Sequence, residues 1–342
     1  MSDAVYVGIR THNSSKIMDE TFQSVYNQTY PNLKLVVYDD HSTDDTVEKL
    51  NKWQEKFAGK GISVEVLSGS ENLGCGKAFE TLGRAVASRM RNNDTFVMID
   101  SDDTFTSENA IANMMVQMKK TKANVLIAGF QLQGDMDLVL NWNSGTPHNN
   151  ISHKLGGLNN SVTVEQMPEI ASAADSIGWT KVVKGEIFKP YMQMFPNVKK
   201  EMSVCEDFPS LAMLLYKNAK ITGLKDTPYN YFKHAGSVTV QARPEDFSVI
   251  RIGYLKTLQK IVKDNRDSFV PSAEQHVNAF LETKYAVISS IVDKKAQQGY
   301  LTGYTKQDFQ HDFHRAIDCS DLKLGDEPPL AQTVKNKKGK TY

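Results

Sequence analysis

Short apolar runs alternate with amphipathic helical patterns over the first 130 residues, and this alternation restricts the chain to few architectures. The runs are rich in β-branched and aromatic residues, as buried strands are. We expect strands at residues 4–9, 33–38, 63–67, 95–99 and 124–130. Apolar residues at helical spacing lie between these runs. Strands that alternate with helices predict an α/β fold with a mostly parallel sheet flanked by helices.

The rest of the chain differs in composition from this first part. Segment 131–161 is rich in Asn and Gly and low in charge, so we expect a polar loop that closes over a site. Its histidines, His148 and His153, are predicted to be solvated. A helical appendage is predicted at the C-terminus, with helices at 247–262, 272–295 and 306–317 and a tail that carries four lysines.

Charge and cysteine content exclude several classes of protein. The 40 basic and 40 acidic residues give a net charge of zero, which argues against a surface covered in basic residues for polyanion binding. A local basic patch remains open. The three cysteines form no paired motif, which fits a reducing compartment. The first residues do not resemble a signal peptide, and no apolar stretch reaches about 18 residues. We therefore expect a cytoplasmic protein, peripheral to a membrane if it contacts one.

The pair Asp39–Asp40 follows the second expected strand directly. Parallel sheets bind ligands beyond the carboxyl ends of their strands, so these carboxylates could accept hydrogen bonds from a base or a sugar. They could instead belong to a helix start, because Ser42 and Asp44 follow in a pattern that resembles a capping box. The local pattern favours the helix start.

A second acidic cluster, Asp100, Asp102 and Asp103, follows the fourth expected strand. Three carboxylates so close together repel one another unless a cation or several hydrogen-bond donors meet them. Mn²⁺ and Mg²⁺ prefer such oxygen ligands and often bind diphosphate oxygens as well. An acidic turn with a structural role explains the pattern equally well.

The third acidic pair, Glu206–Asp207, precedes an apolar helical run at 211–216. Acidic residues at a helix entrance usually stabilise the helix dipole. The functional alternative is a general base whose pKa is raised by neighbouring acids and by partial burial.

The order of these segments is more specific than any one of them. "VGIRTHN", "SVYNQTYPNLKLVVYDDHSTDDT", "ENLGCGKAFETLGRAVA" and "FVMIDSDDTFTSENAI" together resemble the family 2 glycosyltransferases. "SIGWTKVVKGEIF", "CEDFPSLAMLLYKNAKI" and "YNYFKHAGSVT" are similar to later segments of that family. The resemblance covers about residues 4–240. It implies a Rossmann-like GT-A fold and the inverting transfer of a sugar from a nucleotide diphosphate sugar, above all a UDP-sugar, to a hydroxyl group.

The resemblance also implies roles for individual residues. The nucleotide-sugar contacts would be Thr11, His12, Asn13, Asp39, Asp40, Lys77, Asp100 and Ser101. The Asp-x-Asp pair and a later histidine would bind Mn²⁺ or Mg²⁺, with Asp102 foremost, then Asp100 and His234. The catalytic base would be Asp207, with Glu206 beside it, and the acceptor side would include Trp179 and Lys181. His12 departs from the aromatic residue that is usual in the family, so the nucleotide preference stays open.

The same resemblance divides the chain into three parts. Residues 1–130 would form the nucleotide-sugar-binding half of the GT-A domain, 131–243 the acceptor-binding half, and 244–342 a C-terminal helical region with a basic tail. The acceptor would be a surface polysaccharide or a lipid-linked glycan. The C-terminal region could contact a membrane or nucleic acid, which leaves glycosylation of modified DNA, as in phage systems, as an alternative. A nucleotidyltransferase and a non-catalytic nucleotide-sugar-binding module are further alternatives, and nothing predicts the oligomeric state.

Overall fold

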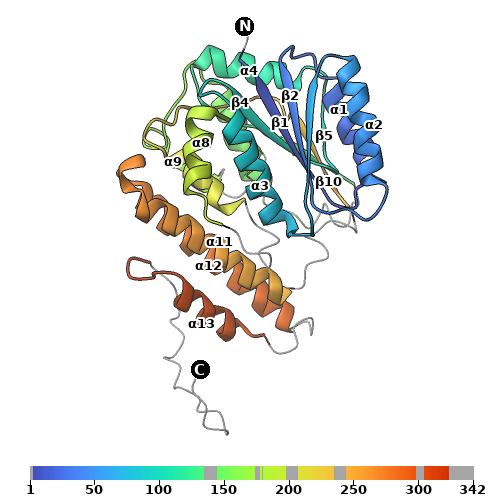
Figure 1. The fold of residues 1–342 in the computed structure, drawn as a ribbon. Helices are drawn as coiled ribbons and strands as arrows, with labels where there is room; N and C mark the ends of the chain where they lie inside the picture. Colours follow the sequence, from blue (N-terminus) through green and yellow to red (C-terminus); the bar gives the residue numbers. More distant parts are fainter. Residues whose placement is uncertain are drawn as a thin grey trace.

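A computed structural model describes residues 3–134, 145–173, 178, 180–197, 207–234, 244–297 and 304–322 (Figure 1). In these residues the main sheet has seven strands. Their order across the sheet is β3 (Ser63–Ser68), β2 (Leu33–Asp39), β1 (Val5–Thr11), β4 (Thr95–Asp100), β8 (Lys181–Lys184), β6 (Val125–Ile127) and β9 (Ile221–Gly223). The first four strands run parallel to one another, whereas β8 is antiparallel to both of its neighbours. The predicted α/β fold with a mostly parallel sheet is confirmed.

A small second sheet lies next to the acidic cluster that follows β4. It contains β5 (Thr104–Phe105), β10 (Tyr229–Lys233) and β7 (Phe130–Gly134), with β10 in the middle. Strand β10 is antiparallel to β5 and parallel to β7. The backbone N–H of Phe232 donates to Oδ1 of Asp103 at 2.9 Å, which joins this sheet to the turn after β4.

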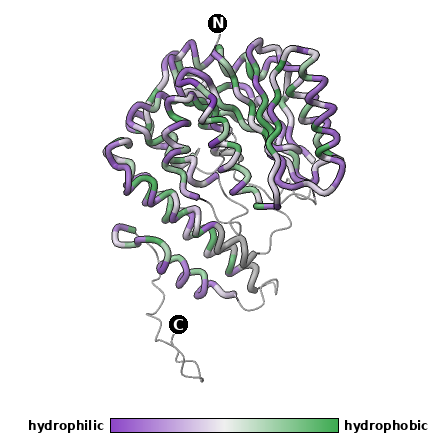
Figure 2. Tube along the Cα trace, viewed as in Figure 1, coloured by the Kyte–Doolittle hydropathy of each residue, from purple (hydrophilic) through white to green (hydrophobic). Residues whose placement is uncertain are grey.

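Helices cover the main sheet and continue beyond it toward the C-terminus (Figure 1). Their amphipathic patterns place buried apolar residues on the sheet side, as Met18, Phe22 and Val25 show in α1. Figure 2 shows hydrophobic residues concentrated along the central strands. The helices of the first part are α1 (Met18–Tyr26), α2 (Thr46–Gly59), α3 (Gly74–Arg89) and α4 (Ala110–Thr121). The second part has α6 (Gly145–Gly156), α7 (Glu169–Ala173), α8 (Gly185–Met194), the 3₁₀ turn η1 (Phe208–Ser210) and α9 (Leu211–Leu215).

The polar loop expected at 131–161 is not what the described part of that segment forms. Strand β7 extends to Gly134, and α6 occupies 145–156, whereas residues 135–144 lie outside the described residues. The buried face of α6 repeats at helical spacing through His148, Ile151, Ser152 and Leu155. Two of these residues are polar, which hid the helical pattern in the sequence.

The predicted solvation of His148 is wrong, although His153 is exposed. The His148 side chain is 1% exposed, and its Nε2 lies 2.9 Å from the carbonyl oxygen of Ala128. Because a carbonyl only accepts, Nε2 carries the proton. Burial, with the nearby charge of Lys181, lowers the pKa of His148 to about 3. The ring is therefore a neutral part of the core.

The single strand predicted at 124–130 is two strands in different sheets. Strand β6 ends at Ile127 in the main sheet, and β7 begins at Phe130 in the small one. At the break, the side chain of Asn149 accepts a hydrogen bond from the N–H of Phe130 at 2.9 Å and donates one to its carbonyl at 2.8 Å. These contacts from α6 hold the backbone where the chain changes sheets.

The predicted C-terminal helices are confirmed. They are α11 (Pro244–Asp264), α12 (Ala273–Gln297) and α13 (Lys306–Ala316), with the 3₁₀ turn η2 (Arg266–Ser268) between the first two. These helices pack on one another, and α11 also packs on η1 and α9 (Figure 1). Their core includes Leu258, Leu281 and Phe313. None of the helices that the structure describes is long and apolar enough to span a membrane. The lysine-rich tail lies outside the described residues, and the three-part division of the chain stays a prediction.

Candidate active site

The carboxyl ends of β1, β2 and β4 lie side by side, because the register of these parallel strands aligns their last residues. Thr11 pairs with Asp39 across β1 and β2, and Arg10 pairs with Asp100 across β1 and β4. The register therefore brings together the first two acidic clusters expected from the sequence.

The turn after β1 is fixed by hydrogen bonds to its neighbours. Asn13 has a left-handed backbone, with φ of 48°, and its side-chain oxygen accepts from the N–H of Thr43 at 2.8 Å. The hydroxyl groups of Ser14 and Ser101 lie 2.9 Å apart, which links this turn to the turn after β4. Asn13 and Ser101 thus lie at the same edge of the sheet, and their contact with a nucleotide sugar stays a prediction.

Asp39 is 1% exposed and holds the turn after β2. Its Oδ1 accepts from the hydroxyl groups of Thr11 at 3.1 Å and Ser42 at 2.5 Å. Its Oδ2 accepts from the N–H of Ser42 at 3.0 Å. The carboxylate is thus satisfied by the protein and has a structural role.

Asp40 is 3% exposed and fixes the start of α3 rather than that of α2. Its two oxygens accept from the N–H groups of Leu73 at 2.9 Å and Gly74 at 2.7 Å. Gly74 has φ of 79°, a left-handed conformation that a glycine adopts without strain. The Asp39–Asp40 pair therefore builds the turns that surround the site.

The acid that does stabilise the start of α2 is Asp44. It accepts from the N–H of Thr46 at 3.0 Å and from the hydroxyl of Ser15 at 2.6 Å. Burial alone would raise the pKa of Asp44, but the hydrogen bonds from Ser15 and Thr46 outweigh it and lower the pKa to about 2. The N-cap residue is Asp45, whose side chain makes no cap hydrogen bond, so the predicted capping box is absent there.

His12 lies at the rim of this edge in a defined tautomer. Its Nε2 lies 2.9 Å from the amide nitrogen of Asn72, and its Nδ1 lies 2.8 Å from the carbonyl oxygen of Asp40. Because the amide nitrogen only donates and the carbonyl only accepts, Nδ1 carries the proton. The sequence did not single out Asn72, because this contact depends on the fold.

Lys77, predicted to face the nucleotide, forms an ion pair inside α3. Its Nζ lies 2.8 Å from Oε2 of Glu80, whose side chain is only 2% exposed. Glu80 also accepts from Nε of Arg84 at 3.0 Å. The sequence did not point to Glu80, although its spacing from Lys77 and Arg84 matches that of helical ion pairs.

In the second acidic cluster, each carboxylate has a different partner. Oδ1 of Asp100 accepts from Nη2 of Arg10 at 2.7 Å, and Oδ2 of Asp102 lies 3.0 Å from Nε2 of His234. Asp103 is 1% exposed and accepts from Phe232, but its Oδ2 has no partner among the described residues. Burial, followed by the charges of the neighbouring acids, raises the pKa of Asp103 well above its usual range and also raises that of Asp102.

The side chains around Asp102 suit a divalent cation that is shared with a substrate. Among the described residues, no three acidic, histidine or cysteine side chains converge as a complete metal site. Asp102 and His234 nevertheless offer an oxygen and a nitrogen ligand within 3.0 Å of each other. Mn²⁺ and Mg²⁺ often bind through one or two protein ligands plus substrate phosphates. Burial and the neighbouring acid Asp100 raise the pKa of Asp102, and Oδ2 of Asp103 has no partner among the described residues, so a cation bound here would favour the ionised form of these carboxyl groups.

Asp207 lies against the segment that leads into β8. A β-carbon added to Gly178 would fall 2.5 Å from Oδ1 of Asp207. The N–H of Lys181 donates to the carbonyl of Gly178 at 3.0 Å, and the Lys181 side chain is 1% exposed. The predicted base and the predicted acceptor-side lysine are therefore on neighbouring segments. Trp179 and Glu206 lie outside the described residues.

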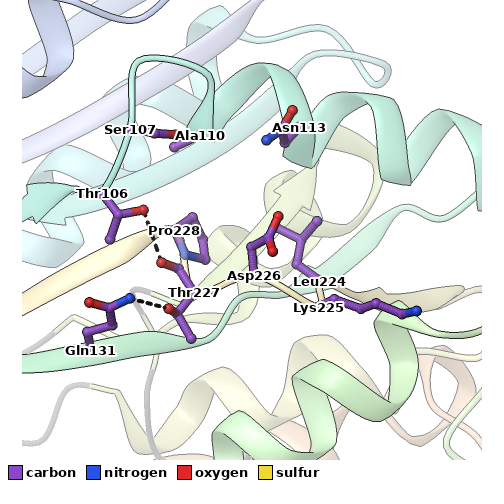
Figure 3. Close-up of a pocket in the computed structure, with 10 residues that line it drawn as sticks. All are labelled: Thr106, Ser107, Ala110, Asn113, Gln131, Leu224, Lys225, Asp226, Thr227 and Pro228. Carbon is purple, nitrogen blue, oxygen red and sulfur yellow. Dashed lines mark hydrogen bonds between the residues drawn. The ribbon is translucent and has the colours of Figure 1, made fainter.

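A pocket of about 420 Å³ is lined in part by Thr227 and Pro228, which directly precede β10 (Figure 3). The hydroxyl of Thr106 and the side-chain amide of Gln131 both donate to Thr227, and Asp226 also lines the pocket. Most of its lining side chains are exposed. The pocket is thus a surface depression separate from the acidic cluster.

The chain resembles known glycosyltransferases in sequence. A family model described as "Glycosyl transferase family 2" matches residues 6–168. A processive diacylglycerol beta-glycosyltransferase of Mycoplasma pneumoniae is 22% identical over 257 residues, which are 70% of this chain and 67% of that protein. The poly(ribitol-phosphate) beta-N-acetylglucosaminyltransferase TarS of Staphylococcus aureus is 28% identical over 251 residues. That match covers 70% of this chain but only 38% of TarS.

Solved structures share the fold. Residues 1–349 of S. aureus TarS in complex with UDP-GlcNAc superpose with a TM-score of 0.64 at 21% identity, covering 92% of this chain and 82% of that one. A mannosyltransferase of Pyrobaculum calidifontis in complex with GDP-Man and Mn²⁺ has a TM-score of 0.52 at 15% identity, covering 91% and 85%. The sequence match over residues 6–168 and the shared fold thus make this chain similar to the family 2 glycosyltransferases.

Proposed function

We propose that this chain is an inverting, metal-dependent glycosyltransferase that moves a sugar from a UDP-sugar to a hydroxyl of a glycan or lipid-linked acceptor. The observation that carries the proposal is the pairing of Asp102 with His234 beside the carboxyl ends of three parallel strands. Ligands of open α/β sheets bind at this edge.

The donor would bind over the turns after β1, β2 and β4. Asp39 and Asp40 would act mainly by shaping these turns, because their oxygens are engaged by the protein. His12 and Asn13, which lie at the rim, would contact the base and the ribose. A UDP-sugar is the favoured donor, because TarS, which shares the fold, binds UDP-GlcNAc.

Asp102 and His234 would hold Mn²⁺ or Mg²⁺. When bound, the cation would supply positive charge to the leaving diphosphate as a Lewis acid. Asp102 suits this role because burial and the charge of Asp100 raise its pKa, so a cation in contact with it would relieve the repulsion. The Mn²⁺ in the related mannosyltransferase structure supports the choice of metal.

Asp207 would accept the proton of the acceptor hydroxyl, which has a high pKa and attacks poorly unless a base removes its proton. Its position against Gly178 places it beside the segment that leads to Lys181. Trp179 would line the acceptor side, whereas Lys181, which is 1% exposed, would support that side from within the protein. This arrangement would put the base and the acceptor on one side of the donor.

The proposed class of acceptor is argued from the glycosyltransferases that this chain resembles. The named relatives act on diacylglycerol or on poly(ribitol-phosphate), which favours lipid or surface-polymer acceptors over modified DNA. We propose a cytoplasmic enzyme that reaches such acceptors at the membrane surface. The C-terminal helices would make the peripheral contact.

The deciding experiment is a screen of nucleotide sugars with Mn²⁺ that follows release of the free nucleotide, repeated with lipid, polymer and DNA acceptors. We expect nucleotide release from a UDP-sugar, accelerated by a lipid or polymer acceptor. Titration calorimetry with UDP and Mn²⁺ separates binding from turnover. Tight binding without release from any donor would favour the non-catalytic module instead, and pyrophosphate release from a sugar phosphate and UTP would favour a nucleotidyltransferase.

A further inference from the structure

Arg10 is the one residue of β1 that is not fully buried, and its guanidinium joins three elements. Its side chain is 11% exposed. Nη2 donates to Oδ1 of Asp100 in β4 at 2.7 Å, and Nη1 donates to the carbonyl oxygen of Cys75 in α3 at 3.0 Å. A planar guanidinium can make such contacts in two fixed directions, which a lysine cannot.

The contact with Arg10 separates Asp100 from the other acids of the cluster. Asp102 is paired with His234, and Asp103 accepts from the backbone of Phe232. Only Asp100 is neutralised by an arginine among the contacts described. A carboxylate in such a pair is a weaker ligand for a cation, because its charge is already compensated. Its remaining oxygen can still accept a hydrogen bond.

We propose that Arg10 is a positioning residue that assigns different tasks to the two acids of the Asp-x-Asp pair. Arg10 holds Asp100 away from the cation and orients it as a hydrogen-bond acceptor for a hydroxyl of the nucleotide. Asp102 and His234 are then left to hold the metal. This inference rests on the proposed function, since it concerns the same donor site.

The inference predicts opposite effects on two ligands when Arg10 is replaced by methionine. Arg10→Met keeps an apolar stem and removes the charge. UDP affinity in the presence of Mg²⁺ should fall about tenfold, as for a lost hydrogen bond to a charged group. Affinity for Mn²⁺ alone should stay the same or rise, because Asp100 becomes free to assist. A purely structural role would weaken both ligands together, and that result would overturn the proposal.

The experiment measures UDP by titration calorimetry and free Mn²⁺ by electron paramagnetic resonance, so neither readout needs turnover. Arg10→Lys keeps the positive charge but lacks the planar guanidinium that contacts Asp100 and Cys75 in two fixed directions. This variant should lose part of the UDP affinity. Arg89→Met is the matched control, since Arg89 forms its ion pair with Glu65 outside the acidic cluster, and it should bind both ligands as the unchanged protein does.

A double-variant cycle shows whether Arg10 acts through Asp100. If it does, Arg10→Met combined with Asp100→Asn should bind UDP no more weakly than Asp100→Asn alone. Additive losses would contradict the proposal even if Arg10→Met is partly destabilised. Failure of the unchanged protein to bind either UDP or Mn²⁺ would contradict the proposed function itself, which keeps the two failures distinct.

Discussion

Gly178 and Asp207 are in direct contact, although 28 residues separate them in the sequence. A β-carbon on Gly178 would lie 2.5 Å from Oδ1 and 3.3 Å from Cα of Asp207. Real β-carbons essentially never approach another atom so closely. Any other residue at position 178 must therefore displace the carboxylate.

Gly178→Ala should lower kcat by at least about tenfold, because a displacement of about 1 Å already costs a large factor in a reaction that depends on alignment. UDP affinity should be unchanged, because the donor turns are elsewhere. Steady-state transfer assays and calorimetry with UDP measure the two effects. Gly59→Ala is the control, since nothing lies within 4 Å of a β-carbon built there. Full activity of Gly178→Ala would show that the position of this carboxylate does not matter.

Asp207→Asn should reduce transfer by about 10²–10⁴-fold, the usual contribution of a general base. The amide has nearly the same shape but cannot take the proton, so the fold and UDP binding should persist. Transfer to the acceptor and circular dichroism test these points. A variant that transfers sugar at the normal rate would remove Asp207 from the role of base.

Asp102→Ala should abolish Mn²⁺ binding and transfer, with a loss of roughly several kcal/mol of charge stabilisation. Chelation by EDTA should inactivate the unchanged protein, and added Mn²⁺ should restore it. Asp264→Asn, which alters an exposed ion pair with Lys260 in α11, is the control and should stay active. Activity that survives complete removal of metal would contradict the assignment of a metal site.

The buried His148 should make folding stability depend on pH. Its pKa is lowered from 6.5 to about 3 in the folded state, by burial first and by Lys181 second. Between these values the unfolded chain binds more protons, so the free energy of unfolding falls as the pH drops below 6.5. The loss should reach about 2 kcal/mol at about pH 5.

His148→Gln tests this dependence, because its amide can still donate to the carbonyl of Ala128. Urea unfolding at about pH 7 and about pH 5 should show a larger loss of stability in the unchanged protein than in the variant. Equal losses in both proteins would mean that His148 is not the group responsible.

The sequence predicts the main sheet well, because the runs 4–9, 33–38 and 95–99 are largely buried and mainly apolar. The run 63–67 is only partly buried, but its apolar residues alternate with polar ones as in a strand at the edge of a sheet. The prediction fails at α6, because a helix face that includes Ser152 looks polar until the fold supplies its partner. That partner is the carbonyl of Ile127, which accepts from the Ser152 hydroxyl at 2.9 Å. Burial of a polar residue depends on a tertiary contact that local periodicity does not contain.

In the candidate site, too, the sequence does not reveal contacts that depend on the tertiary fold. The motifs locate the acids at strand ends, since that follows from chain order alone. They do not tell which acid is engaged by which partner, because Arg10 meets Asp100 only through the register of β1 on β4, and Asp40 meets Gly74 only through the loop before α3. The described residues thus support the predicted location of the site, while the individual roles stay predictions.

The reversed strand β8 has a consequence for how such a protein can change. Lys184 pairs with Thr95 at the beginning of β4, so the first residue of β8, Lys181, lies toward the end of β4 that carries the acids. Parallel strands bring the residues after them to this edge, whereas β8 brings the residues before it. The donor and the acceptor of the proposed reaction would thus be recognised by separate stretches of chain. Mutations on the acceptor side could then change which acceptor is used without changing which sugar donor is bound. Proteins with this same fold could thus make different products.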